Sequence, residues 1–130
     1  SGPMLDRIDI HIEVPRVEYE KLSDDRLGEP SLQVRNRVEG ARKRQITRFS
    51  EDGIICNAEM APRELRKYCH LDETCSGLMR TAMRQMQLSA RAYHRVLKLA
   101  RTIADLAGEE QITPAHLAEA LQYRPKSQML

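Results

Sequence analysis

Residues 88–106 read LSARAYHRVLKLARTIADL, a strongly helical segment that indicates the fold class of the chain. Ser89 is the predicted N-cap, and Gly108 is expected to end the helix. An apolar stripe recurs at helical spacing and is expected to be buried: Ala92, Val96, Leu99, Ala100, Ile103 and Ala107. The opposite side is expected to be polar: Arg91, His94, Lys98, Arg101 and Asp105.

Arg91 has an unusual position, since it is the second residue of this predicted helix. The aligned peptide dipoles make a helix start electropositive, so a cation there costs about 0.3–1 kcal/mol unless an anion lies nearby. Free amide groups at such an end bind anions, phosphate above all, and an arginine adds a bidentate fork. The alternative is a surface arginine paired with a carboxylate. The local pattern leaves both interpretations open.

Four more helices are predicted along the chain, separated by short loops. They span residues 31–49, residues 61–69, a segment that begins near the N-cap Asp72, and a segment that starts at the N-cap Thr113 and fades at 123–125. Two of them carry stripes at helical spacing that are expected to be buried: Val34, Val38, Ala41, Gln45 and Phe49 in the first, and Cys75, Met79, Ala82 and Met86 in the third. The 130 residues are 41% hydrophobic and 31% charged, with no Trp and one Phe, which suits a helical protein better than a β-sandwich. The sequence therefore predicts a mostly α fold, a small helical bundle.

Residues near the N-terminus follow a different period. Ile8, Ile10, Ile12 and Val14 alternate with polar residues up to Pro15, which is typical of a strand with one buried face. No second strand is evident, so this orphan strand is expected to be disordered or to pair with another chain. The mixed-charge residues 16–30 are interpreted as a linker. The pattern indicates a fragment of a larger protein.

The predicted helix 31–49 carries a dense set of cations. Arg42, Lys43 and Arg44 are candidates for phosphate or DNA contact, although a solvated helix face is the more usual meaning of such a run. A free-standing helical module that binds DNA or another protein is the rival function. Its DNA interface would be made by Arg35, Arg37, Arg42, Lys43, Arg44 and Arg48. It would lack aromatic platforms for bases, so its binding should be weak and salt-dependent.

Other chemistry is sparse in this sequence. Arg7 precedes the orphan strand and could act in trans on a neighbour's phosphates, although the spacing alone favours an ion pair with Asp6 or Asp9. The three cysteines lack a CxxC pair, so free thiols and no metal site are expected. No phosphate-binding GxxxxGK[ST] loop is present, so the fragment itself is not expected to be an enzyme. A cytoplasmic chain without a membrane span is expected.

Several motifs together resemble one family. GPMLDRIDIHIEVP, VRNRVEGARKRQITRF, the helix quoted first and ITPAHLAEALQYR occur in the order found in the C-terminal part of magnesium-chelatase-like AAA+ ATPases of the ComM (YifB) group. The resemblance implies an AAA+ lid domain, which covers the nucleotide held by a preceding core domain. It also implies ATP and Mg²⁺ in the intact protein but no cofactor in the fragment, a ring expected to be hexameric, and a role in DNA processing.

The resemblance assigns roles to two arginines and divides the chain. Arg91 is similar to the sensor-2 arginine of a lid, and Arg7 to the arginine finger that acts on a neighbouring subunit. Residues 1–15 would be a remnant of the core with its last strand, 16–30 a linker, 31–123 the helical lid and 124–130 a tail. The expected partners are the chain's own N-terminal core domain, neighbouring subunits and DNA.

Overall fold

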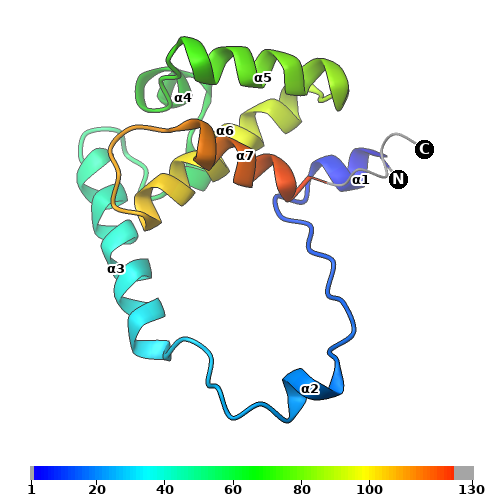
Figure 1. Ribbon diagram of the computed structural model, residues 1–130. Coiled ribbons are helices and arrows are strands. Elements are labelled where there is room, and N and C mark those ends of the chain that lie inside the picture. Colours follow the sequence, from blue (N-terminus) through cyan, green and yellow to red (C-terminus); the bar gives the residue numbers. More distant parts are fainter. Residues whose placement is uncertain (1, 125–130) are drawn as a thin grey trace.

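The computed structural model describes residues 2–124 and consists of helices joined by loops (Figure 1). Their bounds are α1 Gly2–Asp6, α2 Tyr19–Leu22, α3 Ser31–Arg48, η1 Asn57–Glu59, α4 Pro62–Tyr68, α5 Glu73–Gln85, α6 Ala90–Leu106 and α7 Pro114–Gln122. The predicted mostly α bundle is confirmed. None of the helices within residues 2–124 combines the length and apolar content needed to cross a bilayer.

The three longest helices of the C-terminal half, α5, α6 and α7, each begin at a residue whose side chain caps the first turn. Asp72 accepts a bond from the Cys75 amide (2.8 Å) at the start of α5, and Ser89 accepts one from the Ala92 amide (3.1 Å) at the start of α6. The Thr113 hydroxyl caps α7 in the same way. These bonds satisfy amides that a helix start leaves without a partner. All three N-caps match the sequence-based prediction.

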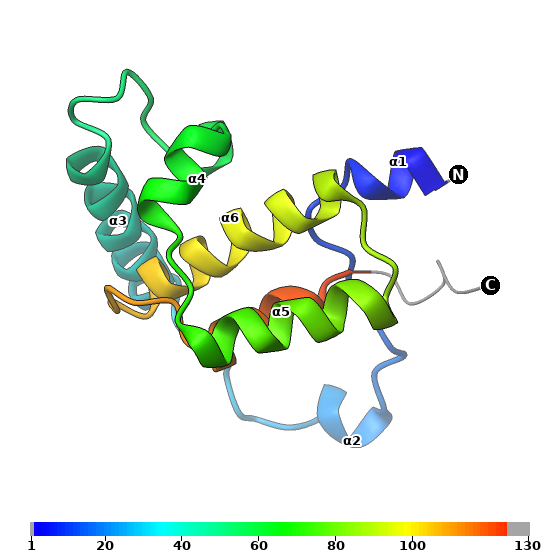
Figure 2. The ribbon, with the colours of Figure 1, turned by 90° about the horizontal axis from the view of Figure 1, so that it is seen from above.

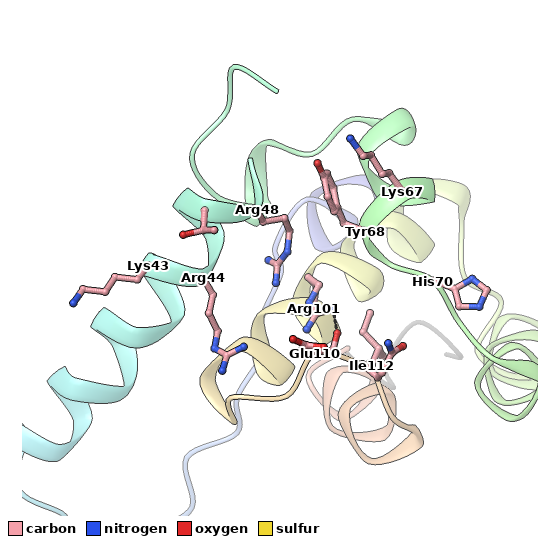
Figure 3. A pocket seen from close by; sticks show the side chains of 11 residues that line it. Lys43, Arg44, Arg48, Lys67, Tyr68, His70, Arg101, Glu110 and Ile112 are labelled. Atoms are coloured by element: carbon pink, nitrogen blue, oxygen red, sulfur yellow. Dashed lines mark hydrogen bonds between the residues drawn. The ribbon is translucent and has the colours of Figure 1, made fainter. Parts of the chain in front are cut away.

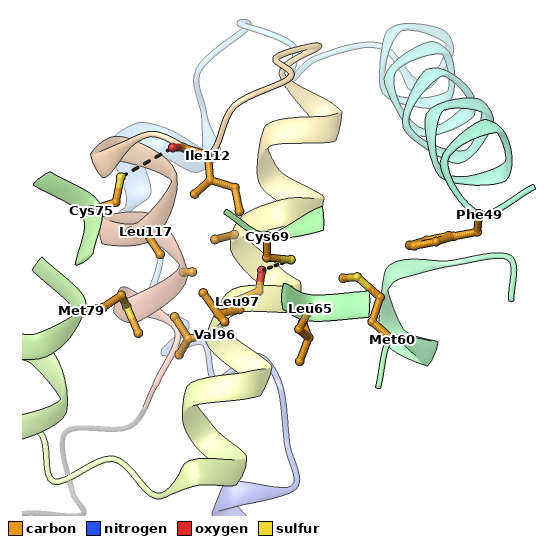
Figure 4. Packing of buried hydrophobic residues seen from close by; sticks show 12 residues of the cluster. Phe49, Met60, Leu65, Cys69, Cys75, Met79, Val96, Leu97, Ile112 and Leu117 are labelled. Carbon is orange, nitrogen blue, oxygen red and sulfur yellow. Dashed lines mark hydrogen bonds between the residues drawn. The ribbon is translucent and has the colours of Figure 1, made fainter. Parts of the chain in front are cut away.

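Helix α6 lies at the centre of the bundle, in contact with α3, α4, η1 and α7, while α5 packs on α7 (Figures 1 and 2). Ala92, Ala100 and Ala104 are fully buried, which lets the neighbouring helices approach α6 closely. Around them lies the core shown in Figure 4, made by Phe49, Met60, Leu65, Cys69, Cys75, Met79, Val96, Leu97, Ile112 and Leu117. Ala107, expected in the apolar stripe, is instead exposed as the C-cap of α6.

The predicted strand Ile8–Val14 does not form, because no other segment among residues 2–124 pairs with it as a strand. Ile12 and Val14 are 69% and 82% exposed. The following residues form a long loop that leaves the bundle, carries α2, and returns to α3 (Figure 1). Two helical segments, α1 and α2, thus occur where the sequence predicted none. The predicted tail 124–130 lies outside the described residues except for Arg124.

Candidate functional site

The start of α6 displays Arg91 as the sequence predicted. Ser89 is the N-cap, and Arg91 is the second helical residue and is exposed to solvent. Within residues 2–124 the Arg91 side chain makes no hydrogen bond or ion pair. The guanidinium and the electropositive helix end can therefore both face an anion that comes from outside the bundle.

A carboxylate of the chain itself lies at this helix start. The Ser89 hydroxyl donates to Asp6 Oδ2 at 2.9 Å, which docks the end of α1 against the first turn of α6. Arg7 follows directly, is exposed, and makes no side-chain bond or ion pair within the described part of the chain. The fold thus brings the regions of Arg7 and Arg91 to the same end of the molecule, although they are 84 positions apart in the sequence.

Two further arginines, not singled out from the sequence, hold the N-terminal segment in place. Arg124 is 3% exposed and donates to the Ile8 carbonyl at 2.9 Å, and it lies 3.4 Å from Asp6 Oδ1. Arg95 forms an ion pair with Asp9 at 2.5 Å. Burial lowers the pKa of Arg124, although an arginine stays charged at neutral pH. The Arg124 contact shows that the first residue of the predicted tail belongs to the folded unit.

The basic triplet of α3 is split between two faces. Lys43 and Arg44 line an open pocket beside α4 and the α6–α7 loop, and Arg44 donates to the Gly108 carbonyl at 3.1 Å. Arg42 lines a different, largely apolar groove with Val38 and Ile46. Successive helix positions point about 100° apart, so three consecutive residues cannot share one face. The structure therefore joins two of these candidate residues and separates the third.

Arg48, which the rival function placed at a DNA interface, is only partly buried but is paired within the fold. It forms a two-pronged ion pair with Asp105, with N–O distances of 2.6 and 2.9 Å, and the Asp105 side chain is fully buried. Asp105 also accepts a bond from Asn57 at 2.9 Å and lies 3.3 Å from Arg101. The expectation that Arg101 and Asp105 lie on a polar outer side of α6 was wrong, because α3 and η1 cover that side.

Arg101 is the functional candidate that the sequence analysis missed. It is 4% exposed and donates to the carbonyls of Glu109 (2.8 Å) and Glu110 (2.7 Å), which fixes the loop after α6. Burial lowers its pKa, and the charge of Asp105 opposes that shift. The spacing of Arg101 and Asp105 by four residues was a visible signal for an ion pair on one helix. Nothing in the sequence indicated that this pair would be buried.

The three cysteines are free thiols, and no group of three or more His, Cys, Asp or Glu among the described residues could hold a metal ion. Burial raises the pKa of the Cys69 and Cys75 thiols to about 11. Their sulfurs donate to the carbonyls of Leu97 and Ile112 (Figure 4). Cys56 is only half-buried.

Alkylation should therefore distinguish these thiols. At pH 7.5 fewer than about one in a thousand Cys69 or Cys75 side chains would be a reactive thiolate, so we expect iodoacetamide to modify Cys56 at least about tenfold faster. Since both raised pKa values lie near 11, raising the pH to 9 should keep the same order. Peptide mass spectrometry measures the three rates, and the chain in urea is the control. Equal rates in the native chain would contradict this burial.

The chain is similar to one sequence family and to several bacterial proteins. Residues 28–124 match the family described as magnesium chelatase, subunit ChlI C-terminal. The competence protein ComM of Haemophilus influenzae is 44% identical over 132 residues, which cover 100% of this chain and 25% of ComM. Proteins named YifB from Salmonella typhimurium and Escherichia coli are 39% and 38% identical, with the same coverage. The chain thus spans about a quarter of the length of these relatives.

Proposed function

The chain belongs to the magnesium chelatase ChlI C-terminal family, and from that premise we propose that it is the lid of an AAA+ ATPase that helps to bind and hydrolyse ATP. In this proposal the intact protein forms a ring of like subunits, expected to be hexameric, and the lid moves with the state of the nucleotide. The name of the Haemophilus influenzae relative supports a role in competence, and through it in DNA processing. A cytoplasmic location belongs to the same proposal.

The observation that carries the proposal is the exposed Arg91 at the start of α6. Its guanidinium and the first amides of the helix are donors of the kind that phosphate needs. ATP with Mg²⁺ would supply the transferable phosphoryl group and its counter-charge. In this chain Arg91 would hold nucleotide phosphates, and Arg7 would act on the nucleotide of a neighbouring subunit. The Mg²⁺ ligands and the phosphate-binding loop are expected in the core domain.

Replacing Arg91 by Ala in the intact protein tests the sensor role. A charge-assisted hydrogen bond contributes about 1.5–3 kcal/mol, so ATP turnover should fall roughly ten- to a hundredfold. The melting temperature should not change, because the exposed side chain leaves no cavity when removed. Arg84→Ala, an exposed arginine of α5, is the matched control and should keep wild-type turnover. Wild-type turnover by assembled Arg91→Ala protein would exclude the sensor role.

The variant Arg7→Ala distinguishes the role of Arg7 from that of Arg91. A finger acts across a subunit interface, so Arg7→Ala subunits should be nearly inactive alone. Mixed with subunits whose own phosphate-binding loop is defective, they should recover part of the turnover, because some interfaces then combine an intact loop with an intact finger. Arg91→Ala subunits mixed in the same way should recover none, because the mutated arginine serves the loop of its own subunit. Equal recovery by both variants would contradict these assignments.

A further inference from the structure

An open pocket of about 560 Å³ lies between α3, α4 and the loop that joins α6 to α7 (Figure 3). Five cationic side chains line it, together with a single carboxylate residue, Glu110: Lys43, Arg44 and Arg48 from α3, Lys67 from α4 and Arg101 from α6. Three separate helices thus contribute cations to the lining, with the Lys43 and Lys67 ammonium groups at its margins and Arg48 and Arg101 between them (Figure 3). The pocket is at the far end of α6 from Arg91, since ten residues of helix span about 15 Å.

The three arginines of this pocket are held in place by the fold. Arg44 donates to the carbonyl of Gly108 at 3.1 Å, where the backbone turns with a φ of +73°. Arg48 is paired with Asp105 through both of its terminal nitrogens, and Arg101 is bonded to two loop carbonyls. An anion that enters would meet guanidinium groups whose side chains are already ordered, so binding would cost little conformational entropy.

The charges around the pocket do not balance. Arg48 and Arg101 share one buried carboxylate, Asp105, so one positive charge remains beside Lys43 and Arg44. Arg101 Nε is also buried and has no hydrogen-bond partner among the described residues, which marks the group as under-satisfied. Opposing carboxylates are few. Glu110 lines the pocket, and Asp52 accepts a bond from Tyr68 and lies 3.9 Å from Lys67.

We propose that this pocket binds a phosphate group through Lys43, Lys67 and the ordered arginines. Guanidinium and ammonium groups together match the geometry and charge of phosphate oxygens. The phosphate could come from a small free phosphate or from the backbone of a nucleic acid, and the chemistry recognised is the same. The inference does not depend on Arg91 or on ATP hydrolysis, because the pocket uses other residues at the other end of α6.

Binding to the 130-residue chain tests the proposal with two probes. Pyrophosphate is titrated by calorimetry at low salt, and a labelled single-stranded DNA 12-mer is followed by fluorescence anisotropy. The double variant Lys43→Gln/Lys67→Gln removes two pocket cations whose side chains are exposed, and the arginine bonds of the fold remain. The control, Lys21→Gln/Arg63→Gln, removes two positive charges from exposed positions outside the pocket.

The pocket variant should bind at least one probe at least about tenfold more weakly, and the control should change affinity by less than about twofold. Glu110→Gln should bind more tightly than wild type, because it removes a carboxylate from the lining. Loss of pyrophosphate binding assigns the pocket to a free phosphate, and loss of DNA binding alone assigns it to a phosphodiester backbone. Equal losses in pocket variant and control, or no binding of either probe at 1 mM by wild type, would overturn the proposal.

Discussion

Replacing Asp105 by Ala is expected to destabilise the fold by about 3–5 kcal/mol, because breaking a buried ion pair leaves uncompensated charge inside the protein. The fully buried carboxylate of Asp105 is bonded to Arg48 at 2.6 and 2.9 Å and lies 3.3 Å from Arg101. It also accepts from Asn57. The substitution would leave these donors in a site that water reaches poorly. Urea denaturation followed by circular dichroism measures the loss.

Two comparisons make the Asp105 experiment decisive. Glu39→Ala removes an exposed carboxylate from α3 and should change the free energy of unfolding by less than about 0.5 kcal/mol. The double variant Arg48→Met/Asp105→Asn should lose less stability than the sum of its two single variants, because each single change leaves the other partner unpaired. Asp105→Ala protein within about 1 kcal/mol of wild type would show that the network does not hold α3 on α6.

Phe49→Ala is expected to lower the free energy of unfolding by about 3–5 kcal/mol, because it opens a cavity at the point where α3 ends. Phe49 is 1% exposed, and its ring meets that of Tyr68 edge-on, with centroids 5.3 Å apart. The pair joins the end of α3 to α4. Because Lys43 and Lys67 lie on these two helices, the same loss of packing should weaken phosphate binding in the pocket.

The matched control for Phe49 lies one turn earlier on the same helix. Ile46 is 59% exposed, so Ile46→Ala should cost less than about 1 kcal/mol by the same urea titration. Phe49→Leu should fall between the two, since leucine fills part of the cavity. A cost for Phe49→Ala no larger than that of Ile46→Ala would mean that this aromatic contact does not stabilise the bundle.

The core was partly predictable from helical spacing. Of the stripe Cys75, Met79, Ala82 and Met86, the first three are buried as expected, whereas Met86 is only partly buried. Along α3 the predicted stripe is buried only in the second half of the helix. Ala41, Gln45 and Phe49 are buried, but Val34 and Val38 are each 39% exposed, because the first half of α3 extends beyond the bundle (Figure 1). Apolar spacing indicates which face could be buried, whereas burial itself needs a partner.

The sequence by itself determined the main helices of the bundle and where they begin, although it did not indicate α1 or α2. Caps such as Ser89 act on amides three residues away, and Gly108 adopts a φ of +73° just after α6, so neighbours along the chain are sufficient to define these ends. The same local information placed Arg91 at the start of a helix. The carboxylate that lies at that start, Asp6, belongs to a segment more than 80 positions away in the sequence.

Only the tertiary structure decided which polar residues lie inside. Arg101 and Asp105 occupy the polar side of α6, and they are buried because Arg48, 57 positions away from Asp105 in the sequence, supplies a complementary charge when α3 packs there. The same packing separates Arg42 from Lys43 and Arg44, and places Lys67 in the lining of the pocket that the latter two also line. The predicted strand failed for the converse reason. Its backbone needs hydrogen bonds from a neighbouring strand, and a strand's own sequence cannot provide that neighbour.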